Sequence, residues 1–197
     1  MSTAIDPALT PDFLKFVFES GLGYADYVAT ADADKRAKWD AFYDSVRLTG
    51  PQHELIGGFV REMPVLVISG VWCGDCVQQC PILARIAEAN PRKVNLRFAD
   101  RDEQMALAEQ VKICGGTRVP VAIFMAEDFE PVQIFGDRTL TRYRKMAEAA
   151  LGANCPVPGA PVPAEEVAEV TADWVDVFER NQLLLRLSTR LRQKHSD

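Results

Sequence analysis

The stretch that decides the fold is residues 64–76, which read PVLVISGVWCGDC. Its first half is a continuous run of β-branched and aliphatic residues, typical of a strand buried on both faces of a sheet. Its second half carries two cysteines separated by two residues, and the apolar side chains of Ile82, Leu83 and Ile86 then recur at helical spacing. We therefore expect a buried strand that turns directly into a helix, with the cysteine pair at the turn.

Strands and helices alternate downstream of this unit. A second strand is expected over residues 94–99, and a helix from 105 to 111 is expected to follow it. Two further strands, 121–125 and 132–135, are close enough in sequence to form a hairpin, and a helix from 139 to 151 follows them. This order predicts an α/β sandwich with a mixed sheet.

Helical patterns flank the sandwich on both sides. Before it, Thr10 and Pro11 resemble a helix start, and helical spacing recurs over 34–46 and 51–60. After it, a proline-rich stretch precedes a long apolar-striped helix expected from residue 164 to 192. The expected parts are an N-terminal helical extension at 1–60, the α/β domain at 61–152, a linker at 153–163 and a C-terminal helix at 164–197. That helix is expected to pack on its own domain or, alternatively, on a second subunit in a homodimer.

Composition restricts the function classes. The chain has 197 residues, of which 48% are hydrophobic and 25% charged, as in a protein with an ordinary core. No run approaches the roughly 20 apolar residues of a membrane span, and the formal charge of −6 argues against nucleic acid and anionic membranes as partners. Residues 1–6 lack the basic start of a secretory signal, and the five cysteines are an odd number. We therefore expect a protein of the reducing cytoplasm.

The Cys73–Cys76 pair carries the chemistry. At a strand-to-helix turn, Cys73 lies at the helix N-terminus, where free backbone N–H groups and the helix dipole favour a thiolate. Cys76 lies one turn further on, close enough to attack a mixed disulfide formed at Cys73. The pair is therefore expected to cycle between dithiol and disulfide.

Other motifs appear in a matching order. Trp72 precedes the first cysteine, Pro81 comes five residues after the second, and residues 116–120 read GTRVP immediately before a strand. Together with the cysteine pair, these motifs resemble the thioredoxin superfamily over residues 60–152. The resemblance implies a thioredoxin-like three-layer sandwich with a mixed sheet. The N-terminal helices and the long C-terminal helix are additions that suggest an elaborated bacterial branch.

The resemblance also implies roles for individual residues. Cys73 would be the attacking nucleophile and Cys76 the resolving cysteine, and Pro120 in the cis form would shape a groove for an extended substrate. The residues implied at this groove are Trp72, Gly74, Asp75, Val119 and Pro120. The implied substrate is a disulfide in a protein or small molecule, and the implied electron donor is a thioredoxin reductase or glutathione system. No cofactor beyond the redox-active disulfide is implied.

Two positions depart from the superfamily pattern. Val67 stands six residues before Cys73, where thioredoxins usually carry a buried aspartate that assists proton transfer to the resolving cysteine. Asp75 stands between the cysteines, and a carboxylate there opposes the thiolate by about 1 kcal/mol or somewhat more. The helix dipole has a comparable effect of opposite sign. We therefore expect Asp75→Asn to raise the reduction potential of the pair.

Cys80 leaves two alternatives open. Cys73, Cys76 and Cys80 match part of a bacterial iron–sulfur signature, so a metal- or cluster-binding module is one alternative to the oxidoreductase. A thioredoxin fold kept as a non-catalytic binding scaffold is the other. The simplest interpretation of Cys80 is a small core residue behind the active helix. Cys114 is expected to be a buried structural thiol, and Cys155 lies in the linker.

Overall fold

A mixed four-stranded sheet forms the centre of the molecule. The computed structural model describes residues 9–151 and 163–197, so the predicted linker, except Pro163, and Cys155 lie outside the described residues. The strands are β1 (Met63–Ser69), β2 (Val94–Asp100), β3 (Val121–Met125) and β4 (Pro131–Gly136), in the order β2-β1-β3-β4. β1 runs parallel to β2, and β3 is antiparallel to both β1 and β4. Every residue of β1 is buried, which confirms the prediction drawn from its continuous apolar run.

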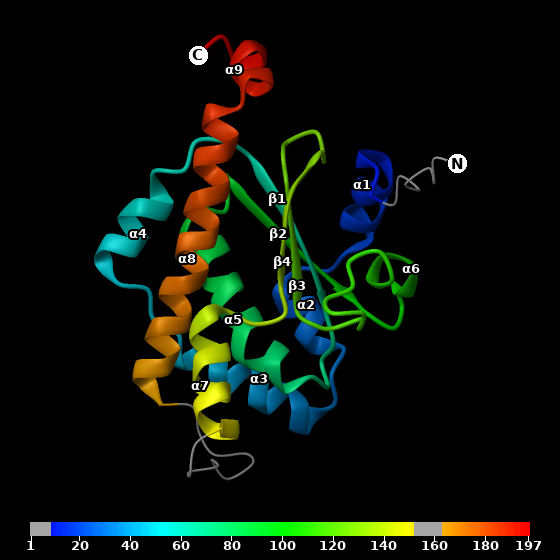
Figure 1. Cartoon of the computed structure of the whole chain (residues 1–197), viewed down its shortest axis with the longest axis vertical. Coiled ribbons are helices and arrows are strands. Elements are labelled where there is room, and N and C mark those ends of the chain that lie inside the picture. Colours follow the sequence, from blue (N-terminus) through cyan, green and yellow to red (C-terminus); the bar gives the residue numbers. More distant parts are fainter. Residues whose placement is uncertain (1–8, 152–162) are drawn as a thin grey trace.

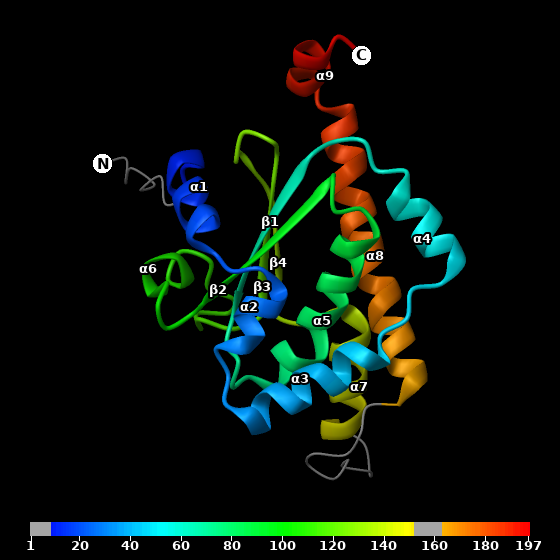
Figure 2. The same cartoon turned by 180° about the vertical axis from the view of Figure 1, so that it is seen from behind.

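Helices cover both faces of this sheet. In the described residues they are α1 (Pro11–Ser20), α2 (Tyr24–Ala29), α3 (Ala33–Ser45), α4 (Gly50–Gly57), α5 (Gly74–Ala89), α6 (Met105–Ala108), α7 (Leu140–Leu151), α8 (Ala164–Leu187) and α9 (Thr189–His195). Figures 1 and 2 show α5, α7 and α8 on one side of the sheet and α1 and α6 on the opposite side. The predicted three-layer α/β sandwich with added helices is therefore present. None of the helices in the described ranges is long and apolar enough to span a membrane.

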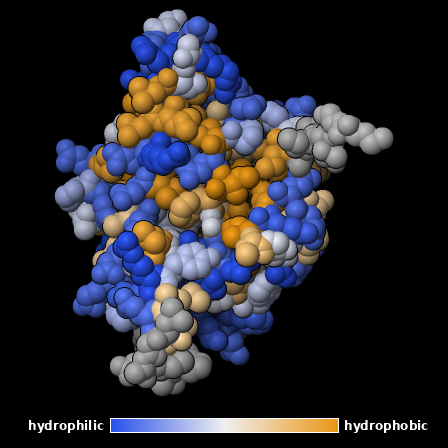
Figure 3. Space-filling model, in the orientation of Figure 1, coloured by the Kyte–Doolittle hydropathy of each residue, from blue (hydrophilic) through white to orange (hydrophobic). Residues whose placement is uncertain are grey.

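The long helix α8 packs on the sheet of its own chain. Trp174 and Phe178 are fully buried, and their rings meet Phe135 of β4 and Phe124 of β3 edge to face, with centroids 5.0 Å apart in each pair. Beyond them the helix leaves leucines uncovered, and Figure 3 shows this hydrophobic patch over its C-terminal half. The side chain of Leu187 is 74% exposed. Association of this end with a second subunit remains a prediction.

Two sequence expectations about elements were wrong, and one helix was not expected. The helix expected over 164–192 ends at Leu187, because Ser188 adopts an extended backbone (ψ 116°) before α9 begins. Serine and threonine side chains compete for backbone hydrogen bonds, which makes Ser188-Thr189 a weak point in a helix. The helix expected over 105–111 is only the single turn α6. Helix α2 was not expected, although Tyr24, Tyr27 and Val28 have helical spacing after Gly23.

Candidate functional site

The two cysteines lie where strand β1 turns into helix α5. Cys73 is the N-cap residue of α5 with an extended backbone, and its side chain is half-buried. Cys76 lies one turn further on and is fully buried. Both are free thiols, and the Cys73 thiol donates a hydrogen bond to the carbonyl oxygen of Val119, with 3.6 Å between sulfur and oxygen. One sulfur is therefore accessible while its neighbour is sheltered behind it.

Both thiols are held mainly in the protonated form. The hydrogen bond with Cys76 and burial raise the pKa of Cys73, and the backbone N–H groups of Cys76 and Asp75 offset this only in part. Burial also raises the pKa of Cys76. Loss of one proton makes loss of the second harder, because the two thiolates would repel each other. The helix N-terminus therefore favours a thiolate at Cys73, but its effect is smaller than that of burial and the neighbouring Cys76 thiol, which favour the protonated form.

The loop before β3 lies against the cysteine pair. The Val119–Pro120 peptide bond is cis, and both residues are buried. Gly136 at the end of β4 closes the other side of this loop: a Cβ there would lie 2.5 Å from the carbonyl oxygen of Pro120. A side chain at position 136 would therefore displace the backbone that faces Cys73.

Trp72 borders the site on its exposed side. Its side chain is 45% exposed, and the guanidinium of Arg101 lies 4.5 Å from the ring centroid. Arg101 also donates a 3.5 Å hydrogen bond to the carbonyl of Thr117, in the loop that leads to Pro120. A Cβ at Gly70 would come within 2.6 Å of the indole, so this glycine permits the ring's position. The motif residues that the resemblance places at a groove are thus close together around Cys73.

Asp75 does not face the solvent as a free carboxylate. Arg138 donates two hydrogen bonds to it, at 3.0 and 2.5 Å, and Arg142 donates a third at 3.4 Å. The side chains of all three residues are less than one-fifth exposed. Planar guanidinium groups bind carboxylates in this two-point manner with high geometric specificity. The charge expected to oppose a thiolate at Cys73 is therefore countered by two arginines.

Cys80 lies in the buried space behind Cys76, close to the end of strand β1. Cys80 is fully buried, and its sulfur lies 3.5 Å from the hydroxyl oxygen of Ser69, the last residue of β1. Val67, which stands where the superfamily pattern has an aspartate, is also fully buried. Cys80 therefore occupies a small core site, as its simplest interpretation held.

The described residues do not favour a metal centre. Within 9–151 and 163–197, no group of three or more histidine, cysteine, aspartate or glutamate side chains is arranged to hold a metal ion. Cys73, Cys76 and Cys80 therefore do not form such a group.

The expectation that Cys114 is a buried thiol was wrong, because Cys114 is exposed in a turn with a positive φ of 50°. The following Gly115-Gly116 pair allows this tight turn.

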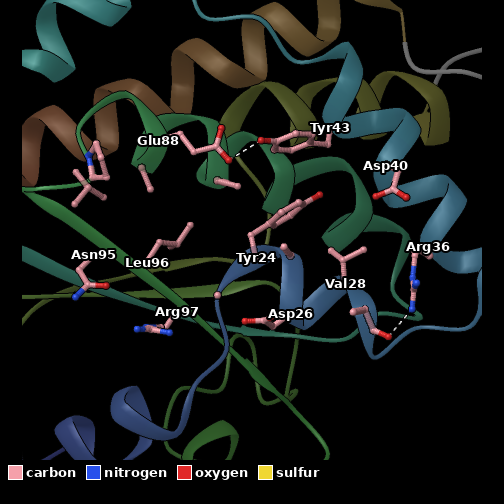
Figure 4. A pocket seen from close by; sticks show the side chains of 17 residues that line it. Tyr24, Asp26, Val28, Arg36, Asp40, Tyr43, Glu88, Asn95, Leu96 and Arg97 are labelled. Carbon is pink, nitrogen blue, oxygen red and sulfur yellow. Dashed lines mark hydrogen bonds between the residues drawn. The ribbon is translucent and has the colours of Figure 1, made fainter.

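A cavity of about 680 Å³ lies away from the cysteines. α2, α3, β2 and the C-terminal half of α5 form its walls, and Figure 4 shows Tyr24 and Tyr43 near its centre, with Tyr43 hydrogen-bonded to Glu88. The cysteine pair lies at the opposite end of α5, and none of the residues predicted to form the site lines this cavity. The cavity therefore lies between the helical extension and the sandwich, away from the cysteine pair.

Sequence reasoning missed the residues that form hydrogen bonds and ion pairs around the first turns of α5, next to the cysteine pair. These are Gln79, Asp137, Arg138, Arg142, Glu166 and Trp174. Gln79 is fully buried and donates a 2.8 Å hydrogen bond to the carbonyl of Asp137, while it accepts one from Trp174 at 3.3 Å. The available signal was a glutamine within an otherwise apolar helix face, together with an acid–base dipeptide directly after a strand. Neither pattern identifies its partner.

Comparisons with known proteins agree with this fold. The sequence model of the family described as Thioredoxin matches residues 21–150. A protein of unknown function from Pseudomonas aeruginosa has a TM-score of 0.65 at 18% identity, covering 83% of this chain and 95% of that one. An HIV epitope-scaffold has a TM-score of 0.60 at 17% identity, covering 81% and 96%. These two likenesses show the fold alone, and no curated protein matches the chain.

Proposed function

The chain belongs to the thioredoxin family, and from that premise we propose that it is a thiol–disulfide oxidoreductase whose Cys73 and Cys76 cycle between dithiol and disulfide. One observation carries the proposal. The accessible Cys73 sulfur lies at the N-terminus of α5, against the Val119–Pro120 loop, with the sheltered Cys76 thiol one turn behind it. This arrangement lets a substrate reach the sulfur of Cys73 and keeps the sulfur of Cys76 sheltered for the second step.

The first step uses Cys73 as the nucleophile. Its thiolate attacks one sulfur of a substrate disulfide, a new S–S bond forms between protein and substrate, and the other substrate sulfur leaves as a thiolate that takes up a proton. Backbone N–H groups at the start of α5 stabilise the attacking thiolate. The carbonyl of Val119, which accepts the thiol's hydrogen bond at rest, must release it before the attack.

The second step uses Cys76 as the resolving group. Cys76 loses its proton, its thiolate attacks the sulfur of Cys73, and the remaining substrate sulfur leaves and is protonated. The pair is now a disulfide, and two electrons and two protons have passed to the substrate. Deprotonation of the buried Cys76 is the demanding part, because burial raises its pKa and Val67 offers no base.

The proposal extends to reaction partners. A disulfide in a protein or in a small molecule is the substrate, and a thioredoxin reductase or glutathione system returns two electrons to the Cys73–Cys76 disulfide. The open position of Trp72, 45% exposed beside the pair, supports a substrate that approaches from the surface.

A chromogenic aromatic disulfide that releases one coloured thiolate per attack tests the two roles. We use a background in which exposed Cys114 and linker residue Cys155 are replaced by serine, so that only the pair and buried Cys80 remain. The intact pair should release two coloured thiolates and retain no adduct, because Cys76 displaces the second one. Cys76→Ala should release one and keep a stable adduct on Cys73.

Cys80→Ala in the same background is the matched control and should behave like the intact pair. Release of a single coloured thiolate by the intact pair, with the adduct retained, would show that Cys76 does not resolve. That result would favour a non-catalytic binding scaffold.

A further inference from the structure

A partly buried ionic network joins Asp75, between the two cysteines, to the C-terminal half of the chain. Arg138 lies between β4 and α7, and Arg142 lies in the first turn of α7. Both bind the Asp75 carboxylate, Arg138 through two nitrogen atoms and Arg142 through one. We refer to Arg138 and Arg142 as the arginine pair.

Each arginine is held in place by a second carboxylate. Arg138 donates a 3.0 Å hydrogen bond to Asp137, which is only 2% exposed, and Asp137 also accepts hydrogen bonds from Tyr143 and Arg118. Burial alone would raise the pKa of Asp137, but these hydrogen bonds lower it, so the group stays ionised.

Arg142 is held from the other side of the network. It pairs with Glu166 in the first turn of α8, whose side chain is 10% exposed. The network is therefore fixed by two carboxylates besides Asp75, and α8 reaches the cysteine motif through it.

We propose that the arginine pair positions and neutralises Asp75, so that its carboxylate does not oppose the thiolate form of Cys73. The inference rests on the proposed redox function of Cys73 and Cys76. Arg138 and Arg142 touch neither sulfur, so they are positioning residues that act through Asp75.

The direction of the effect follows from charge. Only the thiolate form of Cys73 attacks a disulfide or an alkylating reagent, so whatever stabilises the thiolate raises the reactive fraction of Cys73 at a given pH. Loss of Arg138 leaves Asp75 with a single 3.4 Å contact, and the freed carboxylate then disfavours the thiolate. The thiolate fraction of Cys73 becomes smaller, and the thiol reacts more slowly.

The test is the rate at which iodoacetamide alkylates Cys73 at pH 7 in the Cys114→Ser, Cys155→Ser background, measured for Arg138→Gln and for Arg144→Gln. Arg144 is an exposed arginine of α7 and is the matched control. Arg138→Gln should lower this rate roughly three- to tenfold, whereas Arg144→Gln should leave it within about twofold. Arg138→Lys keeps the charge and should restore at least half of the change.

An Asp75→Asn background separates positioning from direct charge. If Arg138 acts through Asp75, its replacement by glutamine should change the alkylation rate less than half as much in that background. An equal change in both backgrounds would overturn the inference, as would an Arg138→Gln effect no larger than that of Arg144→Gln.

Alkylation of Cys73 needs no redox cycle. An unchanged alkylation rate in Arg138→Gln would therefore contradict the inference even if the pair never formed a disulfide. A missing glutathione equilibrium in the wild-type chain would instead count against the proposed function alone.

Discussion

The Cys73 thiol donates its hydrogen bond to a backbone carbonyl, an acceptor that stabilises the protonated form. The 3.6 Å contact with Val119 and the neighbouring thiol of Cys76 both favour the thiol over the thiolate. The dipole of α5 acts in the opposite direction and contributes about 0.3–1 kcal/mol. The nucleophile is therefore mostly protonated at rest, and its reactivity depends on pH.

This dependence can be predicted with its sign. Because the pKa of Cys73 is raised, the thiolate is a small fraction at pH 7 and increases about tenfold per pH unit until the pKa is reached. The rate of Cys73 alkylation by iodoacetamide should therefore keep rising from pH 7 to 9 in the Cys114→Ser, Cys155→Ser background. Free cysteine, with a pKa of about 8.5, serves as the reference thiol. An alkylation rate that reaches a plateau below pH 7 would contradict a raised pKa of Cys73.

Single residues of the site were predictable to different degrees. The cysteine pair, Trp72 and the Val119-Pro120 step carry local patterns that can be recognised in sequence, and the structure brings them together. The sign of the charge at Asp75 was also readable, but its neutralisation was not. Arg138 and Arg142 lie 63 and 67 residues further along the chain, and arginines on a helix start are usually solvent-exposed.

At the scale of elements, the junction between β4 and α7 determines the shape of the site. Gly136 ends β4 next to the backbone of Pro120. The carbonyl of Asp137 accepts a hydrogen bond from the side-chain amide of Gln79. Arg138 binds the carboxylate of Asp75. Three consecutive residues thus contact the proline loop, the middle of α5 and its first turn. A change in this short segment should therefore affect both stability and thiol exchange.

Gly136→Ala tests the junction. The new Cβ would lie 2.5 Å from the Pro120 oxygen and 3.0 Å from the Val121 Cα, and both are backbone atoms that cannot rotate away. We expect a loss of about 1–3 kcal/mol in the free energy of unfolding by urea, together with slower thiol exchange. Gly57→Ala is the control, because no atom lies within 4 Å of the added methyl group, and it should not destabilise the chain. Equal stability of the two variants would refute this role of the junction.

Element types were readable from sequence where periodicity was strong. The buried run of β1, the hairpin of β3 and β4 and the apolar stripe of α8 follow from local spacing. The break at Ser188 did not, because hydrophobic spacing continues through it to Leu191, which is buried in α9. A serine that leaves the helical conformation gives only a weak propensity signal.

At the scale of the whole molecule, the added helix α8 is connected to the elements that surround the cysteine pair. Trp174 donates a hydrogen bond to Gln79, and Glu166 accepts one from Arg142, so two polar contacts join α8 to α5 and α7. The sequence predicted the helix and its apolar stripe. It did not predict these contacts, because a hydrogen bond between residues 95 positions apart depends on packing and leaves no local pattern. This addition to the sandwich thereby supports the site as well as the core.

The central claim is that Cys73 and Cys76 form a reversible two-electron couple. A glutathione redox titration, with the thiols counted by alkylation and mass measurement, tests it most directly. We expect a single transition that gains or loses two thiols, is absent in both Cys73→Ser and Cys76→Ser, and persists in Cys80→Ser. A chain that keeps both thiols across the whole titration, or a transition that requires Cys80, would contradict the account.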